Sequence, residues 1–326
     1  MTRNNIFIQS YGYSGGTLVG DFLNEFNNIS YMRRREFDLF RGSGGIFEMG
    51  QLIEESSNYT KDSMIRRFYK LIDFLDKWGF VQFYGQGFRD LSMQFADSLI
   101  EQKSISEERH LSINERIRPP RNLLRPLYKL FLKEIREVNY DKDTYLIKKM
   151  SKEEYIKLAK KYLEDNFDLL PENNCIPLHH ALIFDMKIDN QLPYFDDNFK
   201  VFIVDKDPRD IYVAMNKGRK VWSLFEYVDD IDTYIERFKR ERQYEKHNMS
   251  LLGDKVMKVR CEDFVLNYDD YKRKILDFTG LKEENHTDKF KYFNPEVSIK
   301  YIGSYKNFEN QDVIRKIEKE LSEYIQ

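Results

Sequence analysis

The sequence has few of the features that mark disulfide-stabilised, membrane-spanning or nucleic-acid-binding proteins. Its 326 residues include only two cysteines, Cys175 and Cys261, which lie far apart and form no C-x-x-C pair. This excludes a disulfide scaffold, a structural zinc site and a thioredoxin-type centre. No apolar run approaches the roughly 20 residues that span a bilayer, and 53 basic against 55 acidic residues leave a net charge of -2. We therefore expect a soluble, cytoplasmic protein that does not bind nucleic acid, in which any polyanion site is local.

The apolar content is sufficient for a large α/β domain. With 41% hydrophobic residues in 39.5 kDa, the chain can bury a sizeable core. Runs at 6–8, 201–204 and 256–259 are largely apolar rather than alternating, which is typical of parallel strands covered on both faces. A helical pattern follows each run, and Gly280 is placed to end the third helix. The sequence predicts a parallel sheet flanked by helices.

Between residues 54 and 170 the pattern changes to long, charged, amphipathic segments, which predict a helical insertion. The short apolar run at 80–84 is expected to be a strand inside it. Part of the insertion is basic and would suit an acidic saccharide or a phosphorylated acceptor, although such a run is more often a solvated helix face. The amphipathic segments are 64–78, 122–137 and 152–166, and the basic residues are Arg109, Arg116, Arg118, Arg121, Arg125, Lys129, Lys133 and Arg136.

A glycine-rich turn, 10–17, connects the first predicted strand to its helix. Small residues there allow several backbone N–H groups to converge on a phosphate at the positive end of the helix. A standard Walker loop needs a lysine near its end, and none follows Gly16, which disfavours an ordinary Mg-ATP site. A tight turn that only packs the helix against the strand remains the alternative.

This turn resembles the phosphosulfate loop of the sulfotransferase family, which uses 3′-phosphoadenosine 5′-phosphosulfate (PAPS). Four residues match that loop, namely Gly12, Ser14, Gly15 and Thr17. Tyr13 stands where the family carries its basic residue, and Gly16 replaces a hydroxyl residue. The resemblance implies that 12–17 bind the 5′-phosphosulfate end of PAPS.

A second block, 201–210, is similar to the family strand that ends in R-D-P-R-D. In the family, the first basic residue and a serine eight positions later bind the 3′-phosphate. Lys206 keeps the positive charge, whereas Ala214 supplies no hydroxyl, so Asn216 is a candidate substitute from the same helix. Arg209 belongs to the same block. Alternatively, Lys206 and Arg209 pair with neighbouring aspartates in a capped surface turn.

Two further stretches extend the resemblance over most of the chain outside the insertion. Residues 259–264 and 275–281 are similar to the family's R-Y-E-D-L and F-L-G-L segments. Residues 302–306 are similar to its G-x-W-K segment, which implies that Tyr305 and Lys306 close over the nucleotide. Lys300 is the one cation close before that segment.

The catalytic base of the family is often a histidine after the strand that precedes R-D-P-R-D. His179 and His180 occupy that place, and His179 fits the family spacing slightly better. Adjacent residues of an extended chain point to opposite faces, so we expect one imidazole in the cleft; the alternative is a pair of capping or buried histidines. For the cation that faces the leaving phosphate, which Tyr13 cannot supply, the candidates are Arg33, Arg34, Arg35 and Arg89.

The resemblance implies a single P-loop-like α/β domain over 1–326, with 54–170 as a candidate acceptor-binding insertion. Its activity would be transfer of a sulfuryl group from PAPS to a hydroxyl acceptor, without a metal, in a cytoplasmic enzyme of bacterial type. Family habits and 15% aromatic residues favour a small-molecule or saccharide acceptor. Two rivals stay open: a P-loop-like sugar or nucleoside kinase, which needs Mg-ATP, and a non-catalytic nucleotide-binding protein, which Tyr13 and Ala214 favour.

Overall fold

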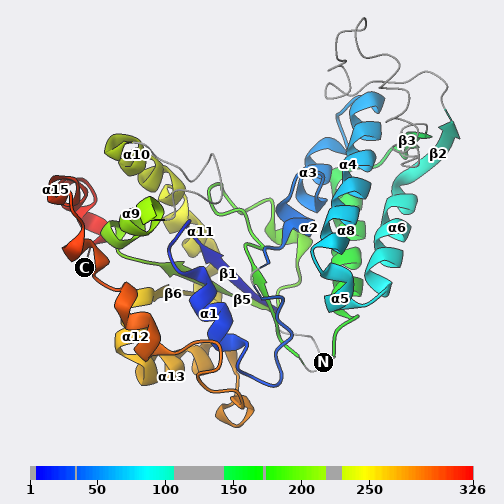
Figure 1. The fold of residues 1–326 in the computed structure, drawn as a ribbon. Coiled ribbons are helices and arrows are strands. Elements are labelled where there is room, and N and C mark those ends of the chain that lie inside the picture. The colour runs from blue at the N-terminus through cyan, green and yellow to red at the C-terminus, as the bar shows by residue number, and fades with distance from the viewer. Residues whose placement is uncertain (1–4, 34, 106–142, 172–173, 218–229, 326) are drawn as a thin grey trace, which may run out of the picture. The chain divides into compact units, whose positions relative to one another are not determined.

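The computed structural model describes residues 5–33, 35–105, 143–171, 174–217 and 230–325, and its chain divides into two compact units (Figure 1). Unit 1 comprises residues 1–41 and 167–326, and unit 2 comprises residues 42–166. The strands and helices are β1 (Asn5–Ser10), α1 (Gly16–Leu23), α2 (Asp38–Arg41), α3 (Ile46–Leu52), α4 (Asn58–Lys77), α5 (Phe80–Tyr84), α6 (Gly87–Leu99), β2 (Ile100–Ile105), β3 (Asp143–Ile147), α8 (Lys152–Phe167), β4 (Ile176–His179), β5 (Phe199–Asp205), α9 (Pro208–Lys217), α10 (Ile231–Arg242), α11 (Glu245–Leu252), β6 (Val256–Arg260), α12 (Cys261–Leu266), α13 (Tyr268–Thr279), α14 (Pro295–Ser298) and α15 (Gln311–Glu320).

Unit 1 contains a four-stranded parallel sheet with the order β4-β1-β5-β6. The three strands predicted from apolar runs are present as β1, β5 and β6, and α1, α9 and α13 follow them as expected. The chain goes from β1 to β4 on one side and then crosses to β5 on the other side of β1. The protein is therefore an α/β protein with a parallel sheet flanked by helices, as predicted.

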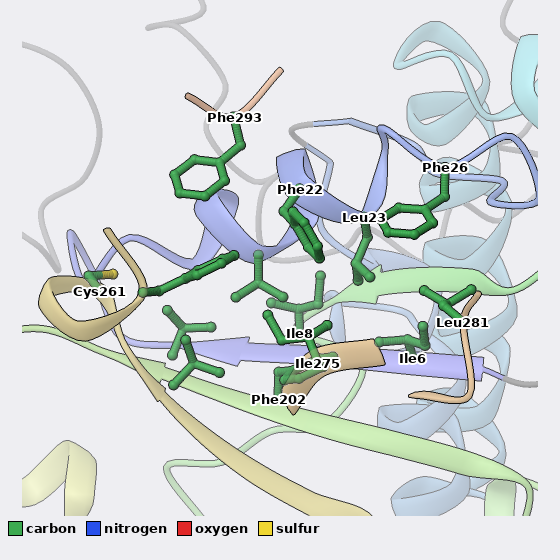
Figure 2. Packing of buried hydrophobic residues seen from close by; sticks show 14 of the residues in the cluster. Ile6, Ile8, Phe22, Leu23, Phe26, Phe202, Cys261, Ile275, Leu281 and Phe293 are labelled. Carbon is green, nitrogen blue, oxygen red and sulfur yellow. The ribbon is translucent and has the colours of Figure 1, made fainter. Parts of the chain in front are cut away.

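One face of the sheet packs against α1, α12 and α13 (Figure 2). Ile6 and Ile8 of β1 and Phe202 of β5 point into this core, where they meet Phe22 of α1 and Phe264 of α12. Phe22 is fully buried and lies edge-on to Phe264, with ring centroids 5.4 Å apart. Removing such a ring costs about 3–5 kcal/mol, so this core fixes α1 against the sheet.

The opposite face of the sheet is also covered, which explains why the strands are apolar without alternation. Phe7 of β1 points to this side and contacts Phe195 and Phe199, with centroid separations of 4.9 and 4.8 Å. Val201 and Ile203 of β5 are fully buried. Residues of β1 and β5 that point to either face of the sheet are therefore buried.

A separate apolar cluster joins α9, α10 and α15. It contains Ile211 and Val213 of α9, Tyr234 and Phe238 of α10, and Ile317 of α15. This cluster fixes α9, which follows β5 directly, against α10 and α15.

Unit 2 consists of the helices α3 to α6 and α8 and an antiparallel pair, β2 and β3, in its described part. It runs over 42–166, whereas the sequence placed the insertion at 54–170. The predicted segments 64–78 and 152–166 lie in α4 and α8; the segment 122–137 and the basic residues from Arg109 to Arg136 lie outside the described residues. No helix of the described residues is long and apolar enough to cross a bilayer.

The strand predicted at 80–84 is wrong, because these residues form α5. A short apolar run carries no period that separates a strand from a buried helical turn. Here Phe80 and Tyr84, four residues apart, lie on the buried face of one helical turn and contact the ring of Phe88 in α6. Glycines at 79 and 85, both with positive φ, bound the turn.

Candidate functional site

The candidate residues gather where the strands of the parallel sheet end. Ser10 ends β1, Lys206 follows β5, and His180 follows β4. Because β1 lies between β4 and β5, His180 and Lys206 flank the loop that leaves β1. A parallel sheet binds ligands outside the carboxyl ends of its strands, where the strand order reverses. The strand order therefore brings together three blocks that lie up to 196 residues apart in sequence, since Lys206 is that far from Ser10.

The loop after β1 is tied to its surroundings at Ser14. The Ser14 hydroxyl donates to the Val204 carbonyl of β5 at 2.8 Å and accepts from the Tyr11 N–H at 2.9 Å. The Cys261 thiol donates to the Ser14 carbonyl at 3.0 Å. Burial raises the pKa of the Cys261 thiol well above its usual value, so this cysteine stays a neutral packing group. Cys261 is therefore a buried free thiol that supports the loop.

Gly15 is required by both conformation and space. Its φ is 85°, in the left-handed region, and a Cβ at this position would lie 2.5 Å from the Cys261 Sγ. α1 begins at the next residue, and the first N–H groups of a helix have no acceptor within the helix. These N–H groups and the positive end of the helix dipole point to the end of the sheet, which suits an anion.

The hydroxyl that the loop lacks at Gly16 is present on a neighbouring residue. A Cβ on Gly16 would overlap the side chain of Ser10, so the Ser10 hydroxyl occupies this space. The Ser10 Oγ also lies 3.2 Å from the His180 Nε2. Position 16 therefore has to be glycine as long as the Ser10 side chain fills this space.

The two histidines lie in different environments, with ring centroids 6.4 Å apart. His179 is buried, its Nε2 is 2.5 Å from the Tyr31 hydroxyl, and it lies against Gly20 of α1. Burial lowers the pKa of His179 to about 4. This ring packs against the first turns of α1, beside Gly16 and Gly20.

His180 lies at the loop itself. Its Nε2 faces the Ser10 hydroxyl, the Glu36 carboxylate is 3.9 Å away, and its side chain is 21% exposed. Burial, with smaller contributions from Arg41 and His179, lowers the pKa of His180 to about 3, so the ring is neutral at pH 7. Its φ of 52° is unfavourable for a residue with a Cβ, and the N–H of His180 is held by the Ile8 carbonyl at 2.8 Å.

Tyr13 is another residue with a Cβ and positive φ, 61°, at the position where the resembled family has its cation. Strained backbone of this kind persists where the surrounding structure holds it and is frequent at functional sites. Phe290 is the third such residue in the described part of the chain, and it lies in a surface turn.

Lys206 and Arg209 have different partners. The Lys206 ammonium group donates to the Tyr301 carbonyl at 3.0 Å, which leaves two of its three donors for a ligand. Arg209 donates to both carboxylate oxygens of Asp207, at 2.9 and 2.6 Å, and to Glu318 at 2.6 Å, and its guanidinium stacks on the Tyr305 ring at 3.9 Å. These partners raise the pKa of Arg209. Arg209 thus pairs with a neighbouring aspartate, and its role at the site remains a prediction.

The segment around Tyr305 is fixed by Asp210 of α9. The Asp210 carboxylate accepts from the Gly303 N–H at 2.7 Å, the Ser304 hydroxyl at 2.8 Å and the Tyr305 N–H at 3.0 Å. This carboxylate joins the two sequence blocks at 201–210 and 302–306, as their common assignment to one site requires. Lys306 is exposed beside Gly303.

The Asn216 Nδ2 donates to the Tyr212 carbonyl of the same helix at 3.0 Å, which uses one of its two N–H groups. Two of the arginines suggested as the leaving-group cation are paired with carboxylates: Arg33 with Asp21, and Arg89 with Asp73 and Asp76. Arg34 lies outside the described residues. The roles of Asn216 and of these arginines at the site remain predictions.

The sequence analysis missed a buried ionic network beside the loop. Arg242 of α10 donates to Asp205 of β5, at 2.8 Å for the shorter bond, and lies between the rings of Tyr11 and Phe238. The Tyr11 hydroxyl donates to Glu245 at 2.5 Å, and burial raises the pKa of Tyr11 far above its usual value. No motif marks these residues, since Arg242 and Glu245 lie in ordinary charged helices whose packing sequence alone does not reveal.

The sequence matches no protein-family model and no curated protein. Among solved structures it is similar to the sulfotransferase domain from the Synechococcus PCC 7002 olefin synthase, with a TM-score of 0.42, 12% identity, and coverage of 97% of this chain and 94% of that chain. It is also similar to the sulfotransferase domain from the curacin biosynthetic pathway, with a TM-score of 0.42, 11% identity and coverage of 98% of each chain. Likeness at this level establishes neither a family nor an activity for this chain.

Proposed function

We propose that the protein transfers a sulfuryl group from PAPS to a hydroxyl acceptor of small-molecule or saccharide type. The observation that carries the proposal is the position of the loop and the start of α1 at the strand ends, between a neutral histidine and a lysine. The four sequence blocks that resemble the sulfotransferase family support it, because Ser14 of the loop contacts Val204 and Cys261, and Asp210 binds the segment at 302–306.

The residues at the strand ends fit the two anionic groups of PAPS unequally. The N–H groups of 15–17 suit the 5′-phosphosulfate, since a helix start binds oxyanions through backbone donors. Lys206 suits the 3′-phosphate, since two of its donors are left over. Arg209 is engaged by Asp207 and Glu318, Asn216 has one amide N–H left besides the one bonded to Tyr212, and Ala214 has no side-chain donor. Bound PAPS would supply the sulfuryl group and a nucleotide leaving group.

His180 is our candidate for the base, in preference to His179. A neutral ring can accept the proton of an acceptor hydroxyl at Nε2. The Ser10 hydroxyl lies 3.2 Å from that nitrogen, so the acceptor hydroxyl would replace Ser10 as the partner of Nε2. The lowered pKa makes His180 a weak base in the free protein, but an anion bound at the adjacent loop favours the protonated ring and raises its pKa. His180 thereby becomes a stronger base when the donor site is filled. His179 would hold β4 against α1 through Tyr31.

A non-catalytic nucleotide-binding protein remains the second candidate. Tyr13 in place of a cation and Ala214 in place of a serine favour it, because both changes remove groups that would contact phosphate. A kinase using Mg-ATP is the weaker rival, since the loop has no lysine.

The proposal is tested by ligand-dependent unfolding with 3′-phosphoadenosine 5′-phosphate (PAP). PAP at a hundredfold excess over its dissociation constant should stabilise the protein by about 2.7 kcal/mol, and Mg-ATP should stabilise it far less. Lys206→Ala should weaken PAP binding by about 1.5–3 kcal/mol, whereas the exposed Lys282→Ala should leave it unchanged. Equal or greater stabilisation by Mg-ATP would favour the kinase.

A further inference from the structure

A small hollow beside the loop has an unsatisfied positive group in its wall. Its lining includes Gly12 and Tyr13 of the loop, Met215 of α9, and Arg237 and Glu241 of α10. The Arg237 side chain is only 18% exposed, and its Nε donates to Glu241 at 2.6 Å. Its Nη1 is buried and has no hydrogen-bond partner among the described residues. Buried donors are almost always paired, so the position of this nitrogen indicates an acceptor that the described chain does not supply.

The neighbouring arginine does not share this property. Arg242 also lines the hollow, but its guanidinium donates to both Asp205 oxygens and to the Phe238 carbonyl. Glu241 lies 3.8 Å from Arg242 and closer to Arg237, so its single charge is divided between two cations. Of these two arginines, Arg237 is therefore the one with a buried donor that lacks a partner among the described residues.

We propose that this hollow is an oxyanion subsite in which Arg237 binds one oxygen of a phosphate or sulfate group. A forked guanidinium fits such an oxygen, and the hollow is too small for a ring but admits an atom about the size of a water molecule. This inference rests on the proposed function in one respect: Arg237 supplies, from α10, the cation that Tyr13 does not supply from the loop. The oxyanion comes either from the 5′ end of the donor or from an anionic acceptor.

The experiment compares Arg237→Gln with Arg240→Gln, a matched change at an exposed arginine of the same helix. Three probes are titrated by calorimetry: PAP, adenosine 3′-monophosphate, which lacks the 5′-phosphate, and inorganic sulfate. If the donor provides the oxyanion, Arg237→Gln weakens PAP about 10- to 100-fold and leaves adenosine 3′-monophosphate unchanged. If the acceptor provides it, PAP is unchanged, but sulfate binding to PAP-saturated protein is lost in Arg237→Gln. Arg240→Gln changes neither.

Glu241→Gln tests the same subsite with the opposite sign. This change deletes a negative charge beside the anion, while the Gln amide oxygen can still accept from the Arg237 Nε, so sulfate should bind more tightly. A misfolded variant cannot give tighter binding, which separates loss of the subsite from loss of the fold. Arg237→Lys should restore part of the affinity, because the charge remains without the fork.

The outcomes separate this inference from the proposed function. Failure of wild-type protein to bind PAP, together with sulfate binding that depends on Arg237, would refute the proposed function and support the subsite. Binding of PAP and sulfate that is equal in wild type, Arg237→Gln and Glu241→Gln would overturn the subsite and leave the proposed function standing.

Discussion

Gly15→Ala should destabilise the protein through two separable effects. A residue with a Cβ at a φ of 85° costs about 1–2 kcal/mol in backbone energy. The added Cβ would lie 2.5 Å from the Cys261 Sγ, and relief of such overpacking costs about a further 1–3 kcal/mol. We expect a total loss of about 2–5 kcal/mol in the free energy of unfolding, measured by urea denaturation.

The chain offers controls for each part of this loss. Gly280 has a φ of 73°, and no atom lies within 4 Å of the position that a Cβ would take there, so Gly280→Ala should show the backbone cost alone. In the double variant Gly15→Ala/Cys261→Ala the sulfur is removed, and the combined loss should be smaller than the sum of the single losses by about 1–3 kcal/mol. Additive losses within about 0.5 kcal/mol would refute the contact between Gly15 and Cys261.

Two further predictions concern buried ionisable groups. Burial lowers the pKa of His179 from its ordinary 6.5 to about 4, so the unfolded chain binds more protons between these values, and stability falls by about 3 kcal/mol as pH decreases through this window. His180, whose pKa is also lowered, adds a fall of similar size, so His179→Gln should remove about half of the fall measured in urea titrations at pH 7 and pH 4.5. An unchanged fall would contradict the burial of the His179 ring. Glu25 accepts from the Tyr292 and Phe293 N–H groups at 2.9 Å and pairs with His286 at 2.8 Å. Glu25→Ala should therefore cost about 3–5 kcal/mol, whereas the exposed Glu284→Ala should change stability by less than about 0.5 kcal/mol.

The strands and the helices that follow them were predictable because their signals are local. Runs such as 201–204 have to be buried on both faces, and Phe7 and Phe202 show each face covered. β4 carried no such signal, since Pro177 and His179 interrupt its apolar pattern. The wrong strand at 80–84 has the same origin: its aromatic residues can be buried by a helical turn as well as by a strand.

The candidate site was predictable only as a list of blocks. The sequence identified the loop, Lys206 and the two histidines, but the choice between His179 and His180 depends on which ring faces Ser10, and that is set by the pairing of β1 with β4. The roles of Arg209, Arg237 and Arg242 depend on partners in other helices and strands, such as Glu318 and Asp205. Long-range pairs of this kind leave no pattern in a single sequence.

The most direct test of the account is the release of PAP from PAPS across a panel of hydroxyl acceptors, measured for the wild type and for His180→Ala. The account predicts acceptor-dependent turnover in the wild type and a decrease of about 10²- to 10⁴-fold in His180→Ala, the usual contribution of a positioned base. PAP affinity should stay nearly unchanged in that variant, because Lys206 and the loop remain. Full turnover in His180→Ala would contradict the assignment of the base, and absence of PAP binding to the wild type would contradict the central claim that the strand ends hold a sulfuryl donor.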